Sequence, residues 1–221
     1  MKLCVIGGAG ARSAFLTKSL VKSTRDIRVD HIVLLDNDQQ KLKTYGEISR
    51  ELSRRLDPDL TFEVTSDARA ALTGVDYIIT TIRAGGDAGR LFDEQTCLAH
   101  GVLGQETTGA GGFAMAIRSV PTLVYYCTLA REVANPGHLI FNFTNPSGII
   151  TQALRSKGFD NVYGICDAPS GFIKQLEEIL EIPYGTLDIE CYGLNHLSWF
   201  RNAKVNGRDV QRELLDNPRT Y

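Results

Sequence analysis

The chain has 221 residues, a formal net charge of −2 at pH 7 and a hydrophobic content of 43%. A chain of this length and composition can bury a full hydrophobic core. Its Lys and Arg residues are scattered along the chain, so the sequence carries no footprint of a nucleic-acid or anionic-membrane partner. The amino-terminal segment has too few consecutive apolar residues for a signal sequence or a membrane span, and we therefore expect a cytoplasmic protein.

Short apolar segments rich in β-branched residues alternate along the chain with longer segments of helical pattern. This alternation predicts a parallel sheet covered by helices on both faces. The expected strands are residues 2–7, 31–36, 61–66, 75–82, 138–143 and 161–166, and the expected helices are 11–23, 38–56, 87–99, 111–134, 147–157 and 170–181.

The pattern changes after about residue 185, where apolar and polar residues alternate around an Asn206-Gly207 turn. Such a segment is typical of antiparallel strands. We therefore expect an α/β fold, a Rossmann-like doubly wound parallel sheet, followed by the start of a mixed α+β substrate subdomain. The expected domains are residues 1–168 for the cofactor and 169–221 for substrate and metal.

A glycine-rich stretch, VIGGAGARSAF, ends the first predicted strand and opens the first predicted helix. It contains Gly-x-Gly-x-x-Ser, a dinucleotide-binding fingerprint in which a small residue replaces the third glycine. Glycine lets backbone N–H groups approach a pyrophosphate, and the helix directs its positive end at it. The expected cofactor-binding residues of this turn are Gly7, Gly8, Gly10, Ala11 and Ser13.

Asp36 follows the second predicted strand. A carboxylate at this place accepts hydrogen bonds from the ribose hydroxyls of NAD, and it repels the 2′-phosphate of NADP. The sequence therefore predicts NAD as the cofactor.

Four further motifs occur in a fixed order along the chain, and together they resemble glycoside hydrolase family 4. The resemblance runs from Met1 to about Asp209 and is greatest for the 6-phospho-β-glucosidase branch. It implies an NAD-dependent and metal-dependent glycosidase, an exception to hydrolysis by two carboxylates. The motifs are GQETTGAGGFAMAIRSVP (104–121), NFTNPSG (142–148), GICDAPSG (164–171) and YGLNHLSW (192–199).

The resemblance implies a divalent metal, usually manganese, held by the cysteine of the third motif and the histidine of the fourth. These ligands fall on Cys166 and His196. A thiolate and an imidazole also favour a borderline transition metal over magnesium or calcium. The remaining coordination positions are left to sugar oxygens and water.

The resemblance also implies the reaction. NAD takes a hydride from C3 of the sugar, which makes the C2 proton acidic. A base removes that proton, the group at C1 is eliminated, water adds, and the hydride returns to C3. The expected substrates are phosphorylated disaccharides or aryl 6-phosphoglucosides, with the 6-phospho-β-glucosides as the first choice.

Further site residues come from the same resemblance. Arg90 matches a family arginine at the substrate pocket, and Asn145 matches a family asparagine that binds the sugar hydroxyls. Asp167 matches the proposed general acid of the phospho-α-glucosidases, whereas the β branch usually has asparagine there, so a 6-phospho-α-glucosidase is an alternative. Gln105 and Glu106 are expected to line the same site.

Two interpretations from other classes stay open: a lactate- or malate-type dehydrogenase, and an inactive nucleotide-binding fragment. The dehydrogenase needs a His/Asp pair and a substrate arginine that these motifs do not supply. Family members are considerably longer, so we expect the tyrosine taken as the C2 base to lie beyond residue 221. The long apolar face of the predicted helix 111–134 is compatible with a homodimer or homotetramer.

Overall fold

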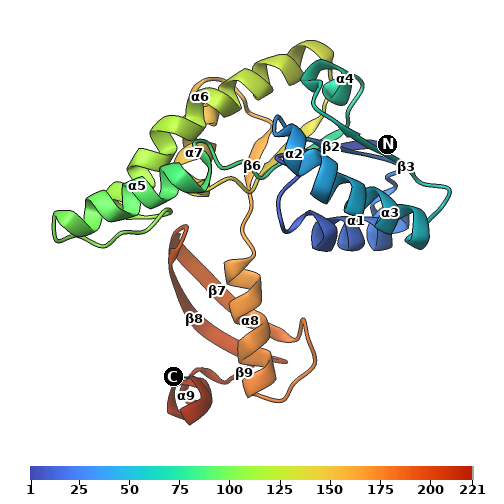
Figure 1. Cartoon of the computed structure of the whole chain (residues 1–221). Coiled ribbons are helices and arrows are strands. Elements are labelled where there is room, and N and C mark those ends of the chain that lie inside the picture. The colour runs from blue at the N-terminus through green and yellow to red at the C-terminus, as the bar shows by residue number, and fades with distance from the viewer. Residues whose placement is uncertain (221) are drawn as a thin grey trace. The chain divides into compact units, whose positions relative to one another are not determined.

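The computed structural model describes residues 1–220 and divides the chain into two compact units, Met1–Ile165 and Cys166–Tyr221. The first unit holds a six-stranded parallel sheet, and the second holds a small antiparallel sheet (Figure 1). This arrangement confirms the predicted fold class. The assignment of a cofactor domain to residues 1–168 and of a substrate and metal domain to 169–221 stays a prediction.

The six predicted strands are all present, and they lie in the order β3-β2-β1-β4-β5-β6. Successive strands first run outwards from β1 to β3, and the chain then returns to β4 on the other side of β1. Open α/β sheets bind ligands outside the carboxyl ends of the strands, at this reversal point. The strands are β1 (Lys2–Ile6), β2 (His31–Leu35), β3 (Thr61–Thr65), β4 (Tyr77–Thr80), β5 (Leu139–Asn142) and β6 (Val162–Gly164).

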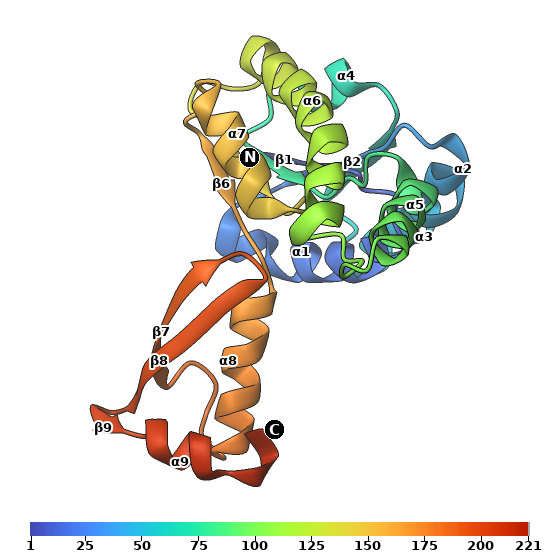
Figure 2. The same cartoon turned by 90° about the vertical axis from the view of Figure 1, so that its left-hand side faces the viewer.

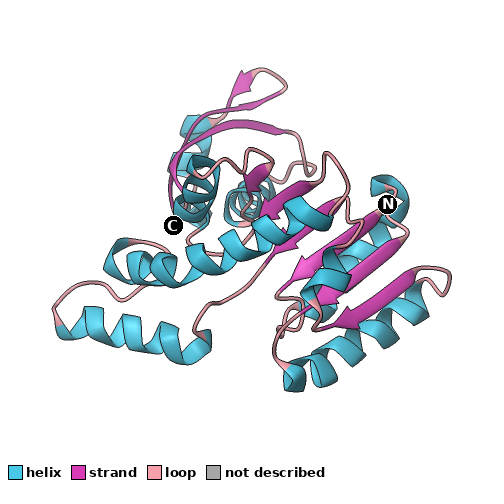
Figure 3. Ribbon diagram, turned by 90° about the horizontal axis from the view of Figure 1, so that it is seen from above, coloured by secondary structure: helices cyan, strands magenta, loops and turns pink. Residues whose placement is uncertain are grey.

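Alternating side chains of the central strands supply two hydrophobic cores, and helices cover both faces of the sheet (Figure 3). Leu3 and Val5 pack with α1, whereas Cys4 and Ile6 join the core on the side of α4, α6 and α7. The helices are α1 (Ser13–Ile27), α2 (Gln39–Lys41), α3 (Glu47–Leu56), α4 (Ala68–Leu72), α5 (Gly86–Ala99), α6 (Gly109–Val133) and α7 (Ser147–Ser156).

The predicted helix 38–56 is correct in extent but is not one α-helix. A π-helical turn, η1 (Leu42–Gly46), joins α2 to α3. Gly46 packs against β3 at this turn, where a Cβ atom would lie only 2.6 Å from Cγ1 of Val64. The short helix α4 was not predicted from the sequence, because five residues are too few to show a helical period.

Helix α6 is long and apolar enough, by length and composition alone, to cross a membrane. In the structure its residues Leu123, Cys127 and Ala130 are buried in the core of the first unit. Packing against the sheet therefore explains one face of α6, whereas Phe113, Ile117 and Tyr125 on the same helix are exposed.

The second unit packs α8 (Ala168–Ile179) alongside a hairpin of two long strands (Figure 2). The predicted antiparallel strands and the turn at Asn206-Gly207 are confirmed, since both turn residues have a positive φ, as a two-residue hairpin turn requires. The other elements are β7 (Leu187–Leu194), β8 (Leu197–Val205), β9 (Arg208–Asp209), α9 (Gln211–Asp216) and the 3-10 turn η2 (Pro218–Thr220).

A buried carboxylate connects α8 to the loop before β7. Glu177 is 1% exposed, and its Oε1 accepts hydrogen bonds from the amides of Gly185, Thr186 and Leu187 at 2.8 to 3.0 Å. These three N–H donors replace part of the water that burial removes from the carboxyl group, whose Oε2 has no hydrogen-bond partner within residues 1–220. The core of this unit is therefore built on one polar side chain as well as on apolar contacts.

Candidate active site

The glycine-rich turn after β1 presents free amides at the start of α1. The amides of Gly7 and Gly8 both donate to the carbonyl of Leu35, at 2.8 and 3.0 Å. Within residues 1–220 the amides of Gly10, Ala11 and Arg12 donate no hydrogen bond. The turn can therefore bind an anion through residues 10–12, while the amide of Gly8, which we expected to face the pyrophosphate, serves the fold.

Helix α1 adds to the positive character of this turn. It begins at Ser13, two residues after the predicted start, and it has neither a side-chain cap nor an acidic residue in its first turn. An uncapped helix start leaves N–H groups unsatisfied and carries a partial positive charge. The turn and the helix start together form a binding site suited to a phosphate group.

The two glycines of the fingerprint are required for different reasons. A Cβ atom on Gly8 would lie 2.9 Å from both Cβ of Leu34 and the carbonyl oxygen of Val5. A Cβ atom on Gly10 would meet no atom within 4 Å. Packing therefore explains Gly8, whereas nothing in the fold requires Gly10, which is the pattern expected where a ligand approaches the backbone.

Ser13, which stands where the fingerprint usually has a third glycine, is buried. Its hydroxyl donates to the carbonyl of Gly8. The side chain therefore braces the turn from inside and leaves the outer side of the turn free.

Asp36 lies beside this turn at the end of β2. Its Oδ2 accepts from the amide of Ala9 at 3.2 Å, and its Oδ1 accepts from the amide of Asp38 at 3.0 Å. Each carboxylate oxygen keeps a lone pair for a further donor, such as a ribose hydroxyl. The structure thus brings Asp36 to the same place as Gly8 and Gly10, and its role toward NAD stays a prediction.

The loop that carries Asn145 is shaped by a buried polar network at the carboxyl end of β5. Asn142 is fully buried, and its Oδ1 accepts from the hydroxyl of Thr80 at 2.8 Å. Its Nδ2 donates to the carbonyls of Thr144 and Ser147, at 3.3 and 3.4 Å. Asn145 itself is half-buried and has no side-chain hydrogen bond within the described chain, so its amide is available to a ligand.

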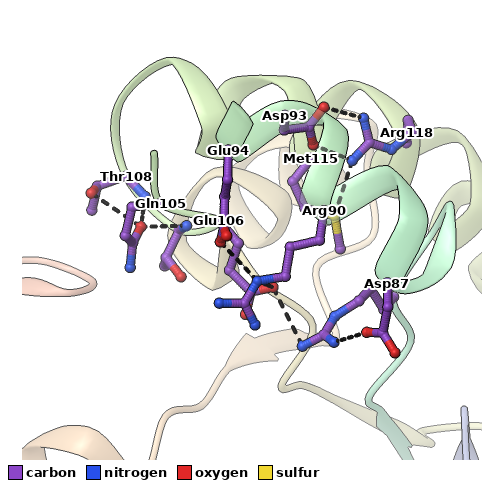
Figure 4. Close-up of polar contacts among 11 residues, drawn as sticks. Asp87, Arg90, Asp93, Glu94, Gln105, Glu106, Thr108, Met115 and Arg118 are labelled. Atoms are coloured by element: carbon purple, nitrogen blue, oxygen red, sulfur yellow. Dashed lines mark hydrogen bonds and ion pairs between the residues drawn. The ribbon is translucent and has the colours of Figure 1, made fainter. Parts of the chain in front are cut away.

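Arg90 lies in a group of charged side chains between α5 and the loop before α6, which we call the α5–α6 charge cluster (Figure 4). The cluster contains three carboxylates and two guanidinium groups. Its net negative charge favours neutral sugar hydroxyls as ligands over a phosphate dianion. The hydrogen bond that Arg90 donates to Glu94, followed by the charge of Glu106, raises the pKa of Arg90. The members are Arg83, Asp87, Arg90, Glu94 and Glu106.

Glu106 connects the two arginines of this cluster. Its Oε2 lies 3.4 Å from Nη2 of Arg83 and 3.7 Å from Nε of Arg90. The same oxygen is buried and accepts no hydrogen bond within residues 1–220. Gln105, beside it, turns inward and its Oε1 accepts from the amides of Thr107 and Thr108, so it supports the start of α6 rather than facing a ligand.

Cys166 and His196 lie in the second unit, 30 residues apart in sequence, and the fold brings them together. Sγ of Cys166 is 3.8 Å from Nε2 of His196. Cys166 stands just before α8, and His196, with φ 61°, occupies the tight turn between β7 and β8. The packing of α8 against the hairpin therefore creates the pair.

The separation and the donor atoms of Cys166 and His196 fit a metal ion. One ion bonded to a thiolate at about 2.3 Å and to an imidazole at about 2.1 Å can span donors at this separation. The chemistry of the donors suits a borderline transition metal. Within residues 1–220 no group of three or more His, Cys, Asp and Glu side chains is arranged so that it could hold a metal ion, so the described chain offers this ion two ligands here.

Asp167 follows Cys166 and is the first residue before α8. Its side chain is exposed and makes no hydrogen bond within the described residues, while its carbonyl accepts from Gly171 and Ser170. A free carboxyl group on the residue after Cys166 can hold and transfer a proton. Its catalytic role stays a prediction.

The residues that hold the candidate site residues in place were not predicted from the sequence. Asn142 lies inside a motif that we singled out, yet nothing in the sequence distinguishes its buried amide from the free amide of Asn145. Asp93, which is buried, forms an ion pair with the partly exposed Arg118 between α5 and α6. The two residues are 25 positions apart, and charged residues in helices are usually solvated, so no local pattern indicates the pair.

A reversing parallel sheet with an open glycine-rich turn, together with a thiol–imidazole pair, defines a nucleotide-binding α/β protein with a candidate metal centre. The chain belongs to family 4 of the glycosyl hydrolases, because residues 2–182 match the family described as Family 4 glycosyl hydrolase. This match confirms the family to which the four ordered motifs pointed.

Similar proteins include enzymes for both anomers. The chain is 35% identical over 219 residues to the 6-phospho-β-glucosidase BglT of Thermotoga maritima, covering 98% of this chain and 51% of that protein. It is 32% identical to the phospho-α-glucosidase PagL of Clostridium acetobutylicum, covering 98% of this chain and 50% of that protein. The chain thus spans about half the length of the curated relatives it matches.

Solved structures agree with this assignment. A 6-phospho-β-glucosidase of Thermotoga maritima, crystallised with manganese, NAD+ and glucose 6-phosphate, matches with a TM-score of 0.90 at 33% identity, over 98% of this chain and 52% of that one. A malate dehydrogenase of Salinibacter ruber matches with a TM-score of 0.69 at 18% identity, over 100% of this chain and 64% of that one. The second likeness shows the fold alone.

Proposed function

We propose that this chain provides the NAD site and two metal ligands of a manganese-dependent 6-phospho-β-glucosidase. The observation that carries the proposal is the approach of Cys166 to His196, whose Sγ and Nε2 atoms lie 3.8 Å apart although the residues are far apart in sequence. A cysteine sulfur beside an imidazole nitrogen is a donor pair suited to a borderline transition metal.

The glycine-rich turn binds the cofactor in this proposal. The free amides of Gly10, Ala11 and Arg12 and the start of α1 bind the pyrophosphate, and Asp36 accepts the ribose hydroxyls. NAD, when bound at this turn, would supply a hydride acceptor for the sugar. The bond from Ala9 to Asp36 keeps the carboxylate beside the turn and so sets the preference for NAD over NADP.

The remaining residues orient the sugar and move protons. Cys166 and His196 hold the metal, which supplies Lewis acidity to the sugar oxygens. Arg90 and Asn145 hydrogen-bond the sugar hydroxyls. Asp167, whose carboxyl group is free, donates a proton to the oxygen of the leaving group.

The β anomer is the first choice because the motifs NFTNPSG, ETTG and NHLSW are similar to the β branch. A 6-phospho-α-glucosidase is the second candidate, and a specific observation favours it, namely aspartate rather than asparagine at Asp167. The predictions of a cytoplasmic location and of a homodimer or homotetramer stay predictions.

The proposal is tested by measuring p-nitrophenol release from the 6-phospho-β-glucoside and from its α anomer, with NAD and Mn2+ together, with each alone and with neither. In a full-length protein that contains this chain and the C2 base, we expect release only when both are present, and faster release from the β anomer. Because the chain spans half the length of its relatives, NAD binding by calorimetry and Mn2+ binding by electron paramagnetic resonance are measured on the same samples.

A Cys166→Ser variant serves as the matched control for the metal. It should lose Mn2+ binding and keep its NAD affinity, since the glycine-rich turn belongs to the other compact unit. Mn2+ binding that is equal in both proteins contradicts the metal assignment. A wild-type chain that binds neither NAD nor Mn2+ contradicts the whole proposal.

A further inference from the structure

The side chain of Arg118, on α6, donates hydrogen bonds to α5 and to the loop between β4 and α5. Its contact with Asp93 of α5 is drawn in Figure 4. Its Nη1 donates to Oδ1 of Asp93 at 3.0 Å, and its Nη2 donates to the other oxygen of the same carboxylate. Its Nε donates to the carbonyl of Ala84 at 3.2 Å. One side chain thus connects α6 both to the body of α5 and to the loop before it.

These contacts leave Arg118 little capacity for a ligand. A guanidinium group has five N–H donors, and Nη2 also lies 3.7 Å from Sδ of Met115. Most of the donors therefore have partners inside the protein. Asp93 is only 5% exposed, so the carboxylate that Arg118 binds is shielded from water. The contacts of this side chain therefore indicate a structural role within the protein and not direct binding of a substrate.

The backbone on the α5 side is shaped around this guanidinium group. A Cβ atom on Gly85 would lie 3.0 Å from Nε of Arg118, and one on Gly89 would lie 3.5 Å from the same nitrogen. Bare backbone at both positions lets the guanidinium plane lie against the first turn of α5. The fit depends on the flat shape of the group as well as on its charge.

The residues held in this way are the neighbours of the two arginines in the α5–α6 charge cluster. Ala84 directly follows Arg83, and Asp93 lies one helical turn after Arg90. The nearest partners of these arginines, Asp87 and Glu94, both lie on α5, four residues after Arg83 and Arg90, and move with that helix. Glu106 lies on the α6 side, so its distances to both arginines depend on how α5 is fixed to α6.

We infer that Arg118 is a positioning residue, which sets where the guanidinium groups of Arg83 and Arg90 stand relative to Glu106 and so prepares the cluster for the sugar. The inference rests on the proposed function for the part that concerns the sugar. Its mechanical part, the fixing of the α5 corner to α6, stands on the contacts alone.

The inference is tested on the 221-residue chain with the variant Arg118→Lys, which keeps the charge but cannot make the planar, forked contact. Arg131→Lys is the matched control, because it is the same substitution on the same helix at a residue whose Nη2 donates to Gly158. Asp93→Asn is a second variant that removes the carboxylate charge at nearly constant volume.

Three quantities are measured: amide hydrogen exchange of residues 83–92, the affinity for glucose 6-phosphate, and the affinity for NAD. In Arg118→Lys and Asp93→Asn we expect exchange of this segment to rise about tenfold and glucose 6-phosphate binding to weaken about tenfold. NAD affinity should stay unchanged, and Arg131→Lys should behave as wild type.

Wild-type exchange and wild-type sugar affinity in both variants overturn the inference. Equal losses of NAD and sugar affinity also overturn it, because Arg118 would then support the whole unit rather than one corner. If the wild-type chain binds NAD but no glucose 6-phosphate, the proposed substrate is wrong, and the exchange measurement alone decides whether Arg118 fixes the corner.

Discussion

The two compact units bury polar groups in different ways. In the first unit a neutral amide, Asn142, lies at the carboxyl end of β5, and apolar cores on both faces of the sheet surround it. In the second unit a carboxylate, Glu177, lies against one small core. The large unit can therefore lose a buried polar contact and still fold, whereas the small unit depends on a single side chain.

The largest effect is expected from Glu177→Leu. The change leaves the buried amide of Leu187 without an acceptor, at about 1 to 3 kcal/mol, and removes the acceptor of the part-buried amides of Gly185 and Thr186, so the second unit should unfold while the first stays folded. Hydrogen exchange of the amides of β7 and β8, compared with those of β1, measures this. Glu178→Leu is the control, because that neighbouring side chain is 63% exposed and should tolerate the change. Full protection of β7 in Glu177→Leu would remove the contrast between the units.

Asn142→Ala should lower the stability of the first unit without unfolding it. We expect a loss of about 2 kcal/mol, since the hydroxyl of Thr80 loses its acceptor, and urea unfolding of the sheet followed by circular dichroism measures it. Asn161→Ala is the comparison variant, because the Nδ2 of Asn161 donates only to the carbonyl of His138. Equal losses in the two variants would show that the buried network at the carboxyl end of β5 has no special weight.

Two glycines allow stability and binding to be separated within the first unit. Gly8→Ala should destabilise it by about 1 to 3 kcal/mol through overpacking against Leu34. Gly10→Ala meets open space, so its melting temperature should stay unchanged while NAD affinity falls about tenfold. Thermal melts and calorimetric titration with NAD measure the two effects. NAD affinity that survives in Gly10→Ala contradicts the placement of the pyrophosphate.

The reactivity of the cysteine thiols should differ between the two units, because their solvent access differs. This difference is expected to have the smallest effect on stability. Burial raises the pKa of Cys4 and of Cys127 to about 12, so both remain thiols at pH 8 and should not react with Ellman's reagent. Cys191 is exposed and Cys166 partly exposed, so these two should react, and Mn2+ should protect Cys166 alone. Cys191→Ser should remove only the phase that is insensitive to Mn2+. Protection of neither thiol by Mn2+ contradicts the metal site.

The same two buried thiols set a pH dependence for the first unit. Their pKa values are raised in the folded protein above the value of 9.0 of an ordinary thiol. The unfolded chain therefore releases these protons at a lower pH than the folded one, and the stability they contribute is complete below pH 9 and lost as pH rises toward 12. Urea unfolding of the sheet at pH 8 and pH 10 checks the direction.

The strands were predictable because each central strand is a continuous apolar run, which only a sheet covered on both faces can bury. The short helices α4 and α9 were not, since five or six residues show no periodicity. The π turn at Gly46 depends on close contact with Val64, a residue from a strand that comes later in the chain. Long-range packing of this kind leaves no local pattern.

The site divides in the same way. The positions of Gly10 and Asp36 followed from the rule that ligands bind at the carboxyl ends of parallel strands. The supporting contacts did not follow, because their partners are distant and chemically ordinary. The acceptor for the amide of Gly8 is the carbonyl of Leu35, and the partner of Asp93 is one arginine among many. Sequence motifs mark the groups that face a ligand, and the structure supplies those that hold them.

The exposed face of the β7–β8 hairpin also bears on the attraction between molecules of this chain in solution. Tyr192, Leu194, Leu197 and Trp199 form two cross-strand pairs on this face, and each is about half exposed or more. Repulsion between molecules is weak, because the net charge at pH 7 is only −2 and the isoelectric point is about 6.1. Attraction between apolar faces should therefore dominate near pH 6, giving a negative second virial coefficient that rises with pH as the molecules gain negative charge.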